Sequence, residues 1–309
     1  PLGLGIDGSH VGALAVSGSN LYAGGWFTGA GGNAANNIAM WNGSAWSALG
    51  SGISGRVLAL AVSGTDLYAG GLFTTAGGSP ANYIAKWDGS AWSPLGLGMD
   101  SCVNALAVSG SCLYAGGFFT NAGGRVVNYI AKWDGSAWSA LGSGMGGSPP
   151  YPPYVYALAV SGPDLYAGGW FTEAGGRAAN YIAKWNGSAW SPLGSGMDNR
   201  VNALAVLGPE LYAGGDFTAA GGKVSGFMAR AIAIPGDWLR IREGVPGPGT
   251  NTLNYVGVPN AQYLVQFATN LTSSPWITLA TNTVAADGRG TLMDCTATNA
   301  QRFYRVGTP

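Results

Sequence analysis

The stretch that decides the fold runs from Val103 to Gly142. It reads Val103-Asn104-Ala105-Leu106-Ala107-Val108-Ser109-Gly110, then Leu113-Tyr114-Ala115-Gly116-Gly117-Phe118-Phe119-Thr120, then Asn128-Tyr129-Ile130-Ala131-Lys132-Trp133-Asp134-Gly135-Ser136-Ala137-Trp138-Ser139-Ala140-Leu141-Gly142. Its central phrase, Leu-Tyr-Ala-Gly-Gly, occurs five times at spacings of 46, 46, 52 and 46 residues, beginning at Leu21, Leu67, Leu113, Leu165 and Leu211. A fixed period in this range indicates repeated supersecondary units.

Each repeat predicts four short β-strands, which in the second repeat span 57–62, 67–73, 83–87 and 92–95. The last two are separated by Asp88-Gly89, a strong hairpin signal. No helical periodicity interrupts the repeats. Four strands in about 46 residues are typical of a β-propeller blade. Gly70 and Gly71, inside a strand pattern, indicate close backbone approach, and Trp87 and Trp92 are expected to form a cross-strand pair that packs between blades.

The repeat resembles the kelch family. The resemblance is carried by a Gly doublet (Gly116-Gly117), an aromatic-acid step (Trp133-Asp134) and a second tryptophan, Trp138, five residues after the first. It is also similar to secreted kelch-like propellers of the cortical polarity-marker type. The likeness covers about residues 1–234 and implies a propeller without implying a function, because one fold hosts many functions. This sequence departs from the kelch pattern in having Trp where Tyr is usual.

The repeats predict a five-bladed propeller over residues 1–234. The fifth set ends near Ala231 without a fourth run, whereas Pro1–Asp7 matches Pro94–Asp100, the end of a fourth run. We expect this N-terminal strand to complete the last blade and close the ring, which removes exposed sheet edges. The alternative is that the strand is donated to a neighbouring molecule, building a polymer. Because the chain begins without Met and within a run, the sequence also predicts a processed product.

Residues 235–309 predict a second domain, a small β-sandwich of immunoglobulin or fibronectin type. Its strand-like runs are 252–256, 263–268, 276–283, 291–294 and 302–306, and Asp287-Gly288 is a hairpin signal. The phrases 263–276 and 301–306 resemble a C-terminal β-domain of large secreted proteins from Verrucomicrobia-like bacteria. That resemblance implies an extracellular or cell-surface location and attachment rather than chemistry.

The composition excludes several classes of function. Only 9% of residues are charged, against about 25% in a typical protein, and 14 basic residues balance 14 acidic ones. The absence of a basic stripe argues against nucleic acid as a partner, and no stretch of 18 apolar residues is present to span a membrane. A neutral, charge-poor surface favours association with other copies.

The sequence predicts no catalytic residue, metal site or cofactor. One histidine, His10, is predicted to stand at a variable loop position, and three scattered cysteines fit no ordinary zinc or copper spacing. Cys102 and Cys112 would lie at opposite ends of a hairpin, roughly 20 Å apart at about 3.3 Å per residue, so we expect no disulfide between them. Cys295 makes the count odd, which leaves at least one thiol free or intermolecular.

A candidate interaction surface lies on the face that carries the loops between the second and third strands. The connection 146–154 is six residues longer than its counterpart after Met99 and is rich in Pro and Tyr. Insertions in repeat proteins often mark a binding face, where Tyr and Arg are favoured. The alternative is a stiff loop with no partner. The residues of this predicted surface are Trp26, Leu72, Phe118, Arg125, Tyr151, Tyr154, Trp170 and Arg177.

The first hypothesis is therefore a non-enzymatic extracellular structural protein whose partners are copies of itself. The second is a propeller that binds glycans or surface proteins through the loop face. Exposure of Trp26, Phe118 and Trp170 would favour the second hypothesis, and burial of all three would count against it. An enzyme is the third.

Overall fold

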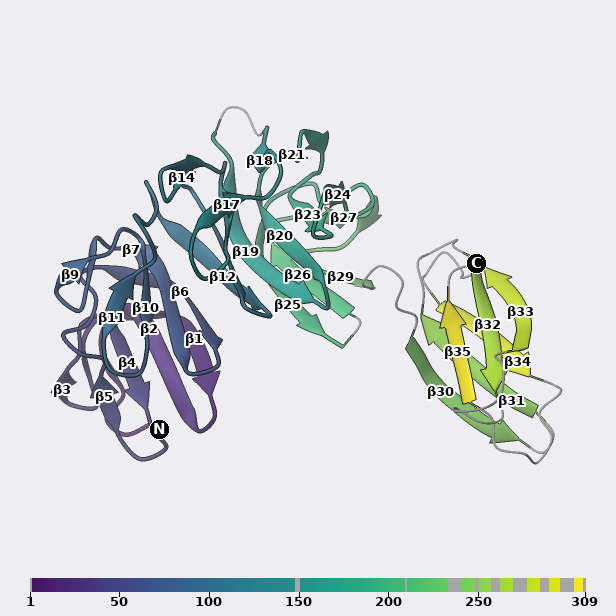
Figure 1. Ribbon diagram of the computed structural model, residues 1–309, viewed down its shortest axis with the longest axis horizontal. Helices are drawn as coiled ribbons and strands as arrows, with labels where there is room; N and C mark the ends of the chain where they lie inside the picture. The colour runs from purple at the N-terminus through teal and green to yellow at the C-terminus, as the bar shows by residue number, and fades with distance from the viewer. Residues whose placement is uncertain are drawn as a thin grey trace. The chain divides into compact units, whose positions relative to one another are not determined.

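The computed structural model describes residues 2–147, 151–208, 210–232, 240–247, 250–256, 262–268, 277–283, 289–294 and 303–307. The chain divides into two compact units. The first comprises Pro1–Leu207 and Leu211–Arg230, and the second comprises Gly208–Glu210 and Ala231–Pro309. The predicted boundary at 234/235 lies outside the described residues. All elements are strands (Figure 1), and no helix long and apolar enough to cross a membrane occurs in the described part of the chain.

The first unit contains five main antiparallel sheets, one per repeat, which we call blades 1 to 5. The main strands of blade 1, in sheet order, are β1 (Ile6–Ser17), β2 (Asn20–Ala30), β4 (Ile38–Trp41) and β5 (Trp46–Ala48), with β3 (Asn33–Ala34) attached to β2. Blades 2, 3 and 4 repeat this order as β6 (Arg56–Ser63), β7 (Asp66–Leu72), β10 (Ile84–Trp87) and β11 (Trp92–Pro94); β12 (Val103–Ser109), β13 (Cys112–Gly117), β16 (Ile130–Trp133) and β17 (Trp138–Ala140); and β19 (Tyr154–Ser161), β20 (Asp164–Trp170), β23 (Ile182–Trp185) and β24 (Trp190–Pro192).

Blade 5 has three strands among the described residues: β25 (Val201–Leu207), β26 (Glu210–Gly215) and β29 (Met228–Ile232). Short strands on the connecting loops complete the unit, namely β8 (Thr75–Ala76), β9 (Ser79–Pro80), β14 (Asn121–Ala122), β15 (Arg125–Val126), β18 (Met145–Gly146), β21 (Glu173–Ala174), β22 (Arg177–Ala178), β27 (Ala219–Ala220) and β28 (Lys223–Val224). Repeated four-stranded antiparallel sheets fit a β-propeller-like fold, as the repeat predicts.

The N-terminal segment differs from the expectation. Residues 2–6 lie on blade 1 and do not extend blade 5: the Leu2 carbonyl accepts a hydrogen bond from Trp46 Nε1, at 2.9 Å, and Ile6 pairs with Ala30. The equivalent stretch after β5 binds blade 2 in the same way, because Leu49 accepts from Trp92 Nε1 and Ile53 bridges to Ala76. The segment between two blades therefore belongs to the blade that follows it.

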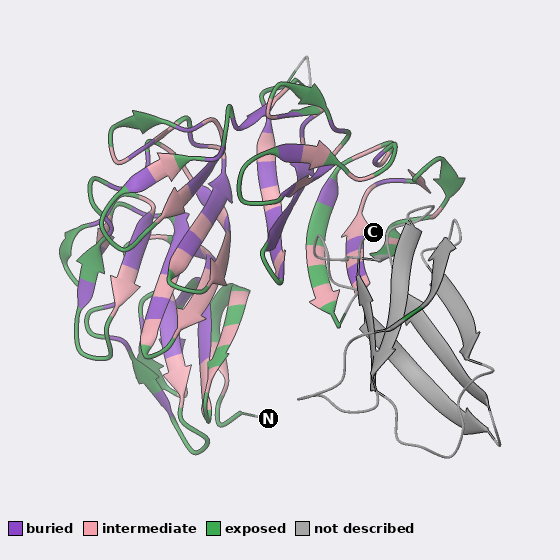
Figure 2. Ribbon diagram, turned by 45° about the vertical axis from the view of Figure 1, so that its right-hand side comes forward, coloured by how far each residue is buried: buried purple, intermediate pink, exposed green. Residues whose placement is uncertain are grey.

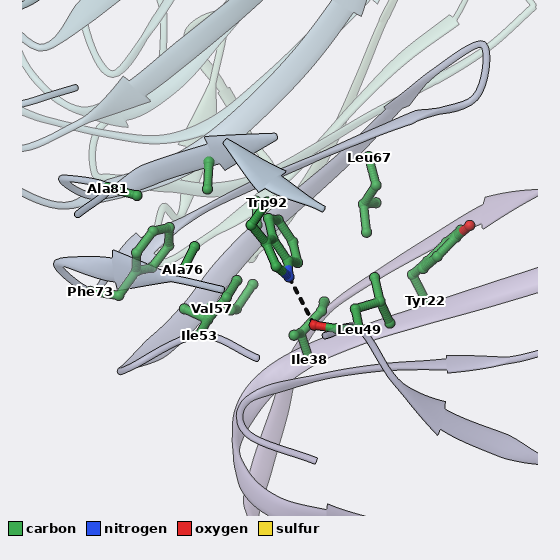
Figure 3. Packing of buried hydrophobic residues seen from close by; sticks show 12 residues of the cluster. Tyr22, Ile38, Leu49, Ile53, Val57, Leu67, Phe73, Ala76, Ala81 and Trp92 are labelled. Atoms are coloured by element: carbon green, nitrogen blue, oxygen red, sulfur yellow. Dashed lines mark hydrogen bonds between the residues drawn. The ribbon is translucent and has the colours of Figure 1, made fainter. Parts of the chain in front are cut away.

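The core lies between neighbouring blades. Figure 3 shows one such cluster, in which Tyr22 and Ile38 of blade 1 pack with Val57, Leu67 and Trp92 of blade 2. The expected tryptophan pair is present, since Trp87 lies opposite Trp92 with ring centroids 5.5 Å apart. Trp92 is buried, and its hydrogen bond to Leu49 links the blade to the preceding connection. The tryptophans therefore serve packing, as predicted.

A register shift between Val57 and Ala59 marks a β-bulge in the first strand of blade 2. A bulge moves a strand's alternation by one residue, so Val57 and Leu60 face the same side. Both point at Gly24 of blade 1, where an added Cβ would lie 3.0 Å from Val57 Cβ and 3.4 Å from Leu60 Cδ1. A valine and a leucine of one blade therefore pack against a glycine of the preceding blade. This contact is the close backbone approach that the Gly doublet predicts.

The same joint recurs at each step along the row of blades. A Cβ at the first glycine of the doublet would lie 3.0 Å from the next blade's valine Cβ at each of these pairs: Gly70 with Val103, Gly116 with Val155, and Gly168 with Val201. The four valines that follow a blade are fully buried. The same glycine–valine contact therefore packs each pair of neighbouring blades together, at four places in the unit.

The turn between the third and fourth strands is fixed by an acidic or amide side chain. The Asp88 carboxylate accepts hydrogen bonds of 2.8 Å from the backbone N–H of Ala91 and of Ser90, and from the Ser90 hydroxyl. These bonds, the one from Ala91 first, lower the pKa of Asp88 from its ordinary value of 3.8 to about 2. Asn42 accepts the same three bonds in blade 1. These contacts confirm the hairpin turn predicted at Asp88-Gly89.

Replacing both Asp88 and Asp134 with asparagine is expected to reduce acid sensitivity while leaving stability near neutral pH close to that of the parent. The pKa of Asp134 is likewise lowered to about 2. A carboxylate with a depressed pKa stabilises the fold above its ordinary pKa, and that contribution is lost as pH falls toward the folded value. Asn42 and Asn186 hold the same turn without titrating. Thermal unfolding between about pH 4 and pH 2 measures the change, and an identical loss of Tm in parent and variant would contradict it.

The second unit contains two three-stranded antiparallel sheets. One is ordered β30 (Arg240–Gly247), β31 (Thr250–Val256) and β34 (Arg289–Asp294), and the other β33 (Ile277–Thr283), β32 (Gln262–Ala268) and β35 (Phe303–Gly307). The predicted runs match β31 to β35, but β30 was missed because its Pro and Gly residues indicate a turn. The Asp287-Gly288 turn lies outside the described residues, and the strands on either side of it, β33 and β34, belong to different sheets rather than to one hairpin.

Candidate functional site

The predicted loop-face surface divides into small intramolecular groups. Trp26 is exposed within β2, directly after the Gly doublet, but the Arg56 guanidinium covers its ring, 3.6 Å from the centroid. Arg56 begins the first strand of blade 2, so this cation–π contact crosses the joint between blades. One face of the exposed indole is therefore occupied by the chain's own side chain.

Phe118 has the corresponding place in blade 3 and is also covered. Tyr154, from the following blade, stacks on Phe118 at 4.2 Å with planes 11° apart, and Tyr156 stacks on Tyr154 at 5.5 Å. Burial raises the pKa of both tyrosines, so the stack is uncharged at neutral pH. These rings form part of the packing between blades and leave little aromatic surface for a ligand.

Trp170 lies edge-on against Tyr181 at 5.7 Å and against the exposed Tyr151 at 6.3 Å. Its Nε1 is buried and has no hydrogen-bond partner among the described residues. Arg125 and Arg177 sit on exposed hairpins, opposite Ala122 and Ala174. Leu72 is exposed at the end of β7. The structure thus brings Tyr151 to Trp170 and Tyr154 to Phe118, and places both arginines in the loop hairpins rather than in either aromatic group.

The other candidate residues fall as follows. His10 is a strand residue of β1, opposite Trp26, and not a loop residue as the sequence suggested; its ring bonds Ser9. Cys112 pairs with Ser109 beside the turn of the β12–β13 hairpin, and Cys102 lies at the opposite end, where its carbonyl accepts a hydrogen bond from the Phe118 N–H, as expected. Cys295 lies outside the described residues. No group of three or more His, Cys, Asp or Glu suited to a metal occurs in the described part of the chain.

A surface that sequence reasoning missed lies at each end of the row of blades. We define the leading face as Val11, Leu14 and Val16 on β1, and the trailing face as Gly214, Phe227 and Met228 on blade 5. All five large side chains are exposed. Val11 is 41% exposed whereas its counterpart Val57 is 0% exposed, and Met228 is 67% exposed whereas its counterpart Ile38 is 0% exposed. Figure 2 shows β1 with exposed and intermediate residues along most of its length.

Aligning the repeats could have revealed these faces. Positions that are buried between neighbouring blades become exposed to solvent in the first and last blades of an open row, because one neighbour is missing. The expectation of a closed ring hid this signal, because closure would have buried both faces.

The chain was compared with known proteins. No family model matches it, and no curated protein matches it. Among solved structures it is similar to the computationally designed protein Ika8, at 15% identity over 84% of each chain and a TM-score of 0.41. It is also similar to the extracellular domain of a hybrid two-component system from B. thetaiotaomicron, at 12% identity over 87% of this chain and 35% of that chain, with a TM-score of 0.48. A family 43 arabinoxylan arabinofuranohydrolase from Bacillus subtilis is similar at 12% identity over 97% of this chain and 93% of that chain, with a TM-score of 0.31. All three TM-scores are too low to carry an argument about this chain.

Proposed function

We propose that this chain is a non-enzymatic extracellular structural protein, a five-bladed kelch-like propeller unit followed by a β-sandwich domain, whose partners are copies of itself. One observation carries the proposal: large apolar side chains are exposed at both ends of the row of blades, where Leu14 and Met228 are 61% and 67% exposed. The terminal units of repeat proteins normally present a polar outer face for solubility. A row that ends in apolar side chains on both sides is suited to association.

The low charge of the chain supports the same proposal. Lys and Arg balance Asp and Glu at 14 each, so copies do not repel one another. The blades are also nearly identical in their joint residues, so a surface that packs well against its neighbour inside the chain is already optimised for repetition. The extracellular location rests on the resemblance to secreted proteins and is proposed with it.

The test is the mass of the purified chain across concentrations, measured by light scattering after size-exclusion chromatography, with electron microscopy of the same samples. We expect the mass to rise with concentration and rows or filaments to appear. A single monomeric mass from micromolar to millimolar concentration, with isolated particles in the micrographs, would overturn the proposal.

A second candidate is a propeller that binds glycans or surface proteins through the loop face. It is favoured by Trp170, whose buried Nε1 has no hydrogen-bond partner among the described residues and whose ring lies beside the exposed Tyr151. The covered faces of Trp26 and Phe118 count against a continuous aromatic platform. A glycan array compares the parent with Trp170→Phe; binding that is lost in the variant supports this candidate, and no binding by the parent removes glycans as its ligand.

A further inference from the structure

The leading and trailing faces are the two halves of the joint that links the blades. At each internal joint, the first glycine of the doublet receives the valine and leucine of the next blade; a Cβ at Gly70, for example, would lie 3.4 Å from Leu106 Cδ1. Val11 and Leu14 hold the positions of that valine and leucine in blade 1. Gly214 holds the glycine position in blade 5, and the nearest atom to a Cβ there is its own blade's Phe227 carbonyl oxygen, at 3.9 Å.

We infer that the leading face of one copy docks on the trailing face of another, forming a fifth joint that joins chains head to tail. This inference rests on the proposed function and names its surfaces. The partner is a second copy because the complement of each face is present on this chain, and because the four internal joints display how the two halves fit. A second copy can dock while all four internal joints keep the geometry seen here.

The residues bordering the fifth joint are chemically compatible. At two internal joints, the first residue of a blade lies on the residue that follows the Gly doublet of the preceding blade, as Arg56 lies on Trp26 and Tyr154 on Phe118. At the fifth joint these positions bring His10 to Asp216. An imidazole N–H can donate a hydrogen bond to a carboxylate. Asp216 already accepts from Arg200 and Asn202, so its charge is balanced before docking.

Blade 5 differs from the other blades at three positions, and two of them carry larger apolar side chains. Gly226 replaces the asparagine that holds the connection in blades 1 to 4, where for example Asn82 Nδ2 donates to the Leu97 carbonyl at 3.1 Å. Phe227 replaces Asn37 or a tyrosine, and Leu207 replaces a serine that precedes the turn. Both of these large side chains are exposed. Blade 5 therefore exposes apolar side chains at positions where blades 1 to 4 have serine, asparagine or tyrosine.

The experiment uses charge complementation in the full chain. Val11→Glu places a negative charge on the leading face, and Met228→Lys places a positive charge on the trailing face. Each variant alone is expected to associate at least ten-fold more weakly than the parent. When the two are mixed, a 1:1 dimer is expected through the joint that keeps both parental faces, the leading face of Met228→Lys on the trailing face of Val11→Glu. Growth beyond this dimer is expected as well, because at the other joint the glutamate of one copy meets the lysine of the other. Gly214→Ala is a third variant, expected to weaken association without changing the Tm of the monomer.

The outcomes separate this inference from the proposed function. If the parent associates and the single variants associate equally well, the docking surfaces are wrong while self-association stands. If the parent is monomeric at every concentration, both are overturned. If the parent is monomeric and Val11→Glu lowers its Tm, the fifth joint is made inside one chain and the head-to-tail inference fails. Thermal unfolding of each variant at low concentration provides that last measurement.

Discussion

Replacing Trp138 with phenylalanine is expected to lower the free energy of unfolding by about 0.5–1.5 kcal/mol, because it removes one of the two hydrogen bonds that the buried Leu95 carbonyl accepts. The other comes from the Gly98 N–H, at 3.2 Å, and remains. Trp138 is 2% exposed, and its Nε1 donates to the Leu95 carbonyl at 2.9 Å. Leu95 itself is buried and follows the last strand of the preceding blade. Phenylalanine keeps an aromatic ring in the pair with Trp133 but has no donor. Trp138→Ala should cost more, about 3–5 kcal/mol, since it also empties a large volume.

The matched control is Trp133→Phe. Trp133 lies across the ladder from Trp138, with centroids 5.3 Å apart, and is half-buried. Trp133→Phe removes the same ring atoms from a less buried site, so the larger effect expected for Trp138→Phe combines the hydrogen bond between blade and connection with the deeper burial of that ring. Urea unfolding followed by circular dichroism gives both values. Equal losses in the two variants would show that the hydrogen bond to Leu95 adds little.

Gly70→Ala is expected to destabilise the chain by about 1–3 kcal/mol through overpacking at one joint. The added Cβ would lie 2.5 Å from Val103 Cγ1 and 3.0 Å from Val103 Cβ, and Val103 is 0% exposed. Neither side can move without displacing the blade. Gly70 lies in the regular ladder of β7, so a change in backbone preference does not explain the loss.

Gly214→Ala is the internal control, because it makes the same substitution at the same position of blade 5. There the nearest atom to an added Cβ is 3.9 Å away, so the monomer should change by no more than about 0.5 kcal/mol. The double variant Gly70→Ala, Val103→Ala should recover part of the loss, as contacting residues couple. Chemical unfolding of dilute samples measures all three variants. A Gly70→Ala variant as stable as Gly214→Ala would contradict the joint as described.

Much of the fold could be predicted because the same pattern of strands and turns occurs in five repeats of the sequence. Alternation predicted the strands of blade 2 to within about two residues, and Asp88-Gly89 predicted the turn that the structure contains. The exceptions have physical causes. Tyr83, predicted to begin the third strand, precedes it with φ of 64°, where its N–H donates to the Phe73 carbonyl and its carbonyl accepts from Gly71. A left-handed tyrosine is disfavoured locally and held by tertiary hydrogen bonds, so propensity cannot reveal it.

The candidate site was harder to predict because the type of a residue and its variation between repeats do not show which neighbours its side chain contacts. Trp26 and Phe118 were predicted to bind a partner because they are aromatic and their position varies between repeats. In the structure each is covered by a side chain of the next blade, Trp26 by Arg56 and Phe118 by Tyr154, and that position also varies between repeats. The leading and trailing faces went unnoticed for the opposite reason. Val11 and Leu14 follow the consensus, and a consensus residue is assumed to have its usual neighbour. Only the three-dimensional row shows which neighbour is missing.

The joint also bears on how the number of repeats could change over time. Deleting residues 96–141 would connect Leu95 directly to Gly142 and set Gly70 against Val155 in place of Val103, with the glycine, valine and leucine of the joint unchanged in type. Stability in such arrays is close to a sum of unit and nearest-neighbour contributions. Recombination between repeats would therefore yield shorter or longer chains that fold without further adjustment. The joint itself therefore constrains the number of blades less than it constrains the residues of any one blade.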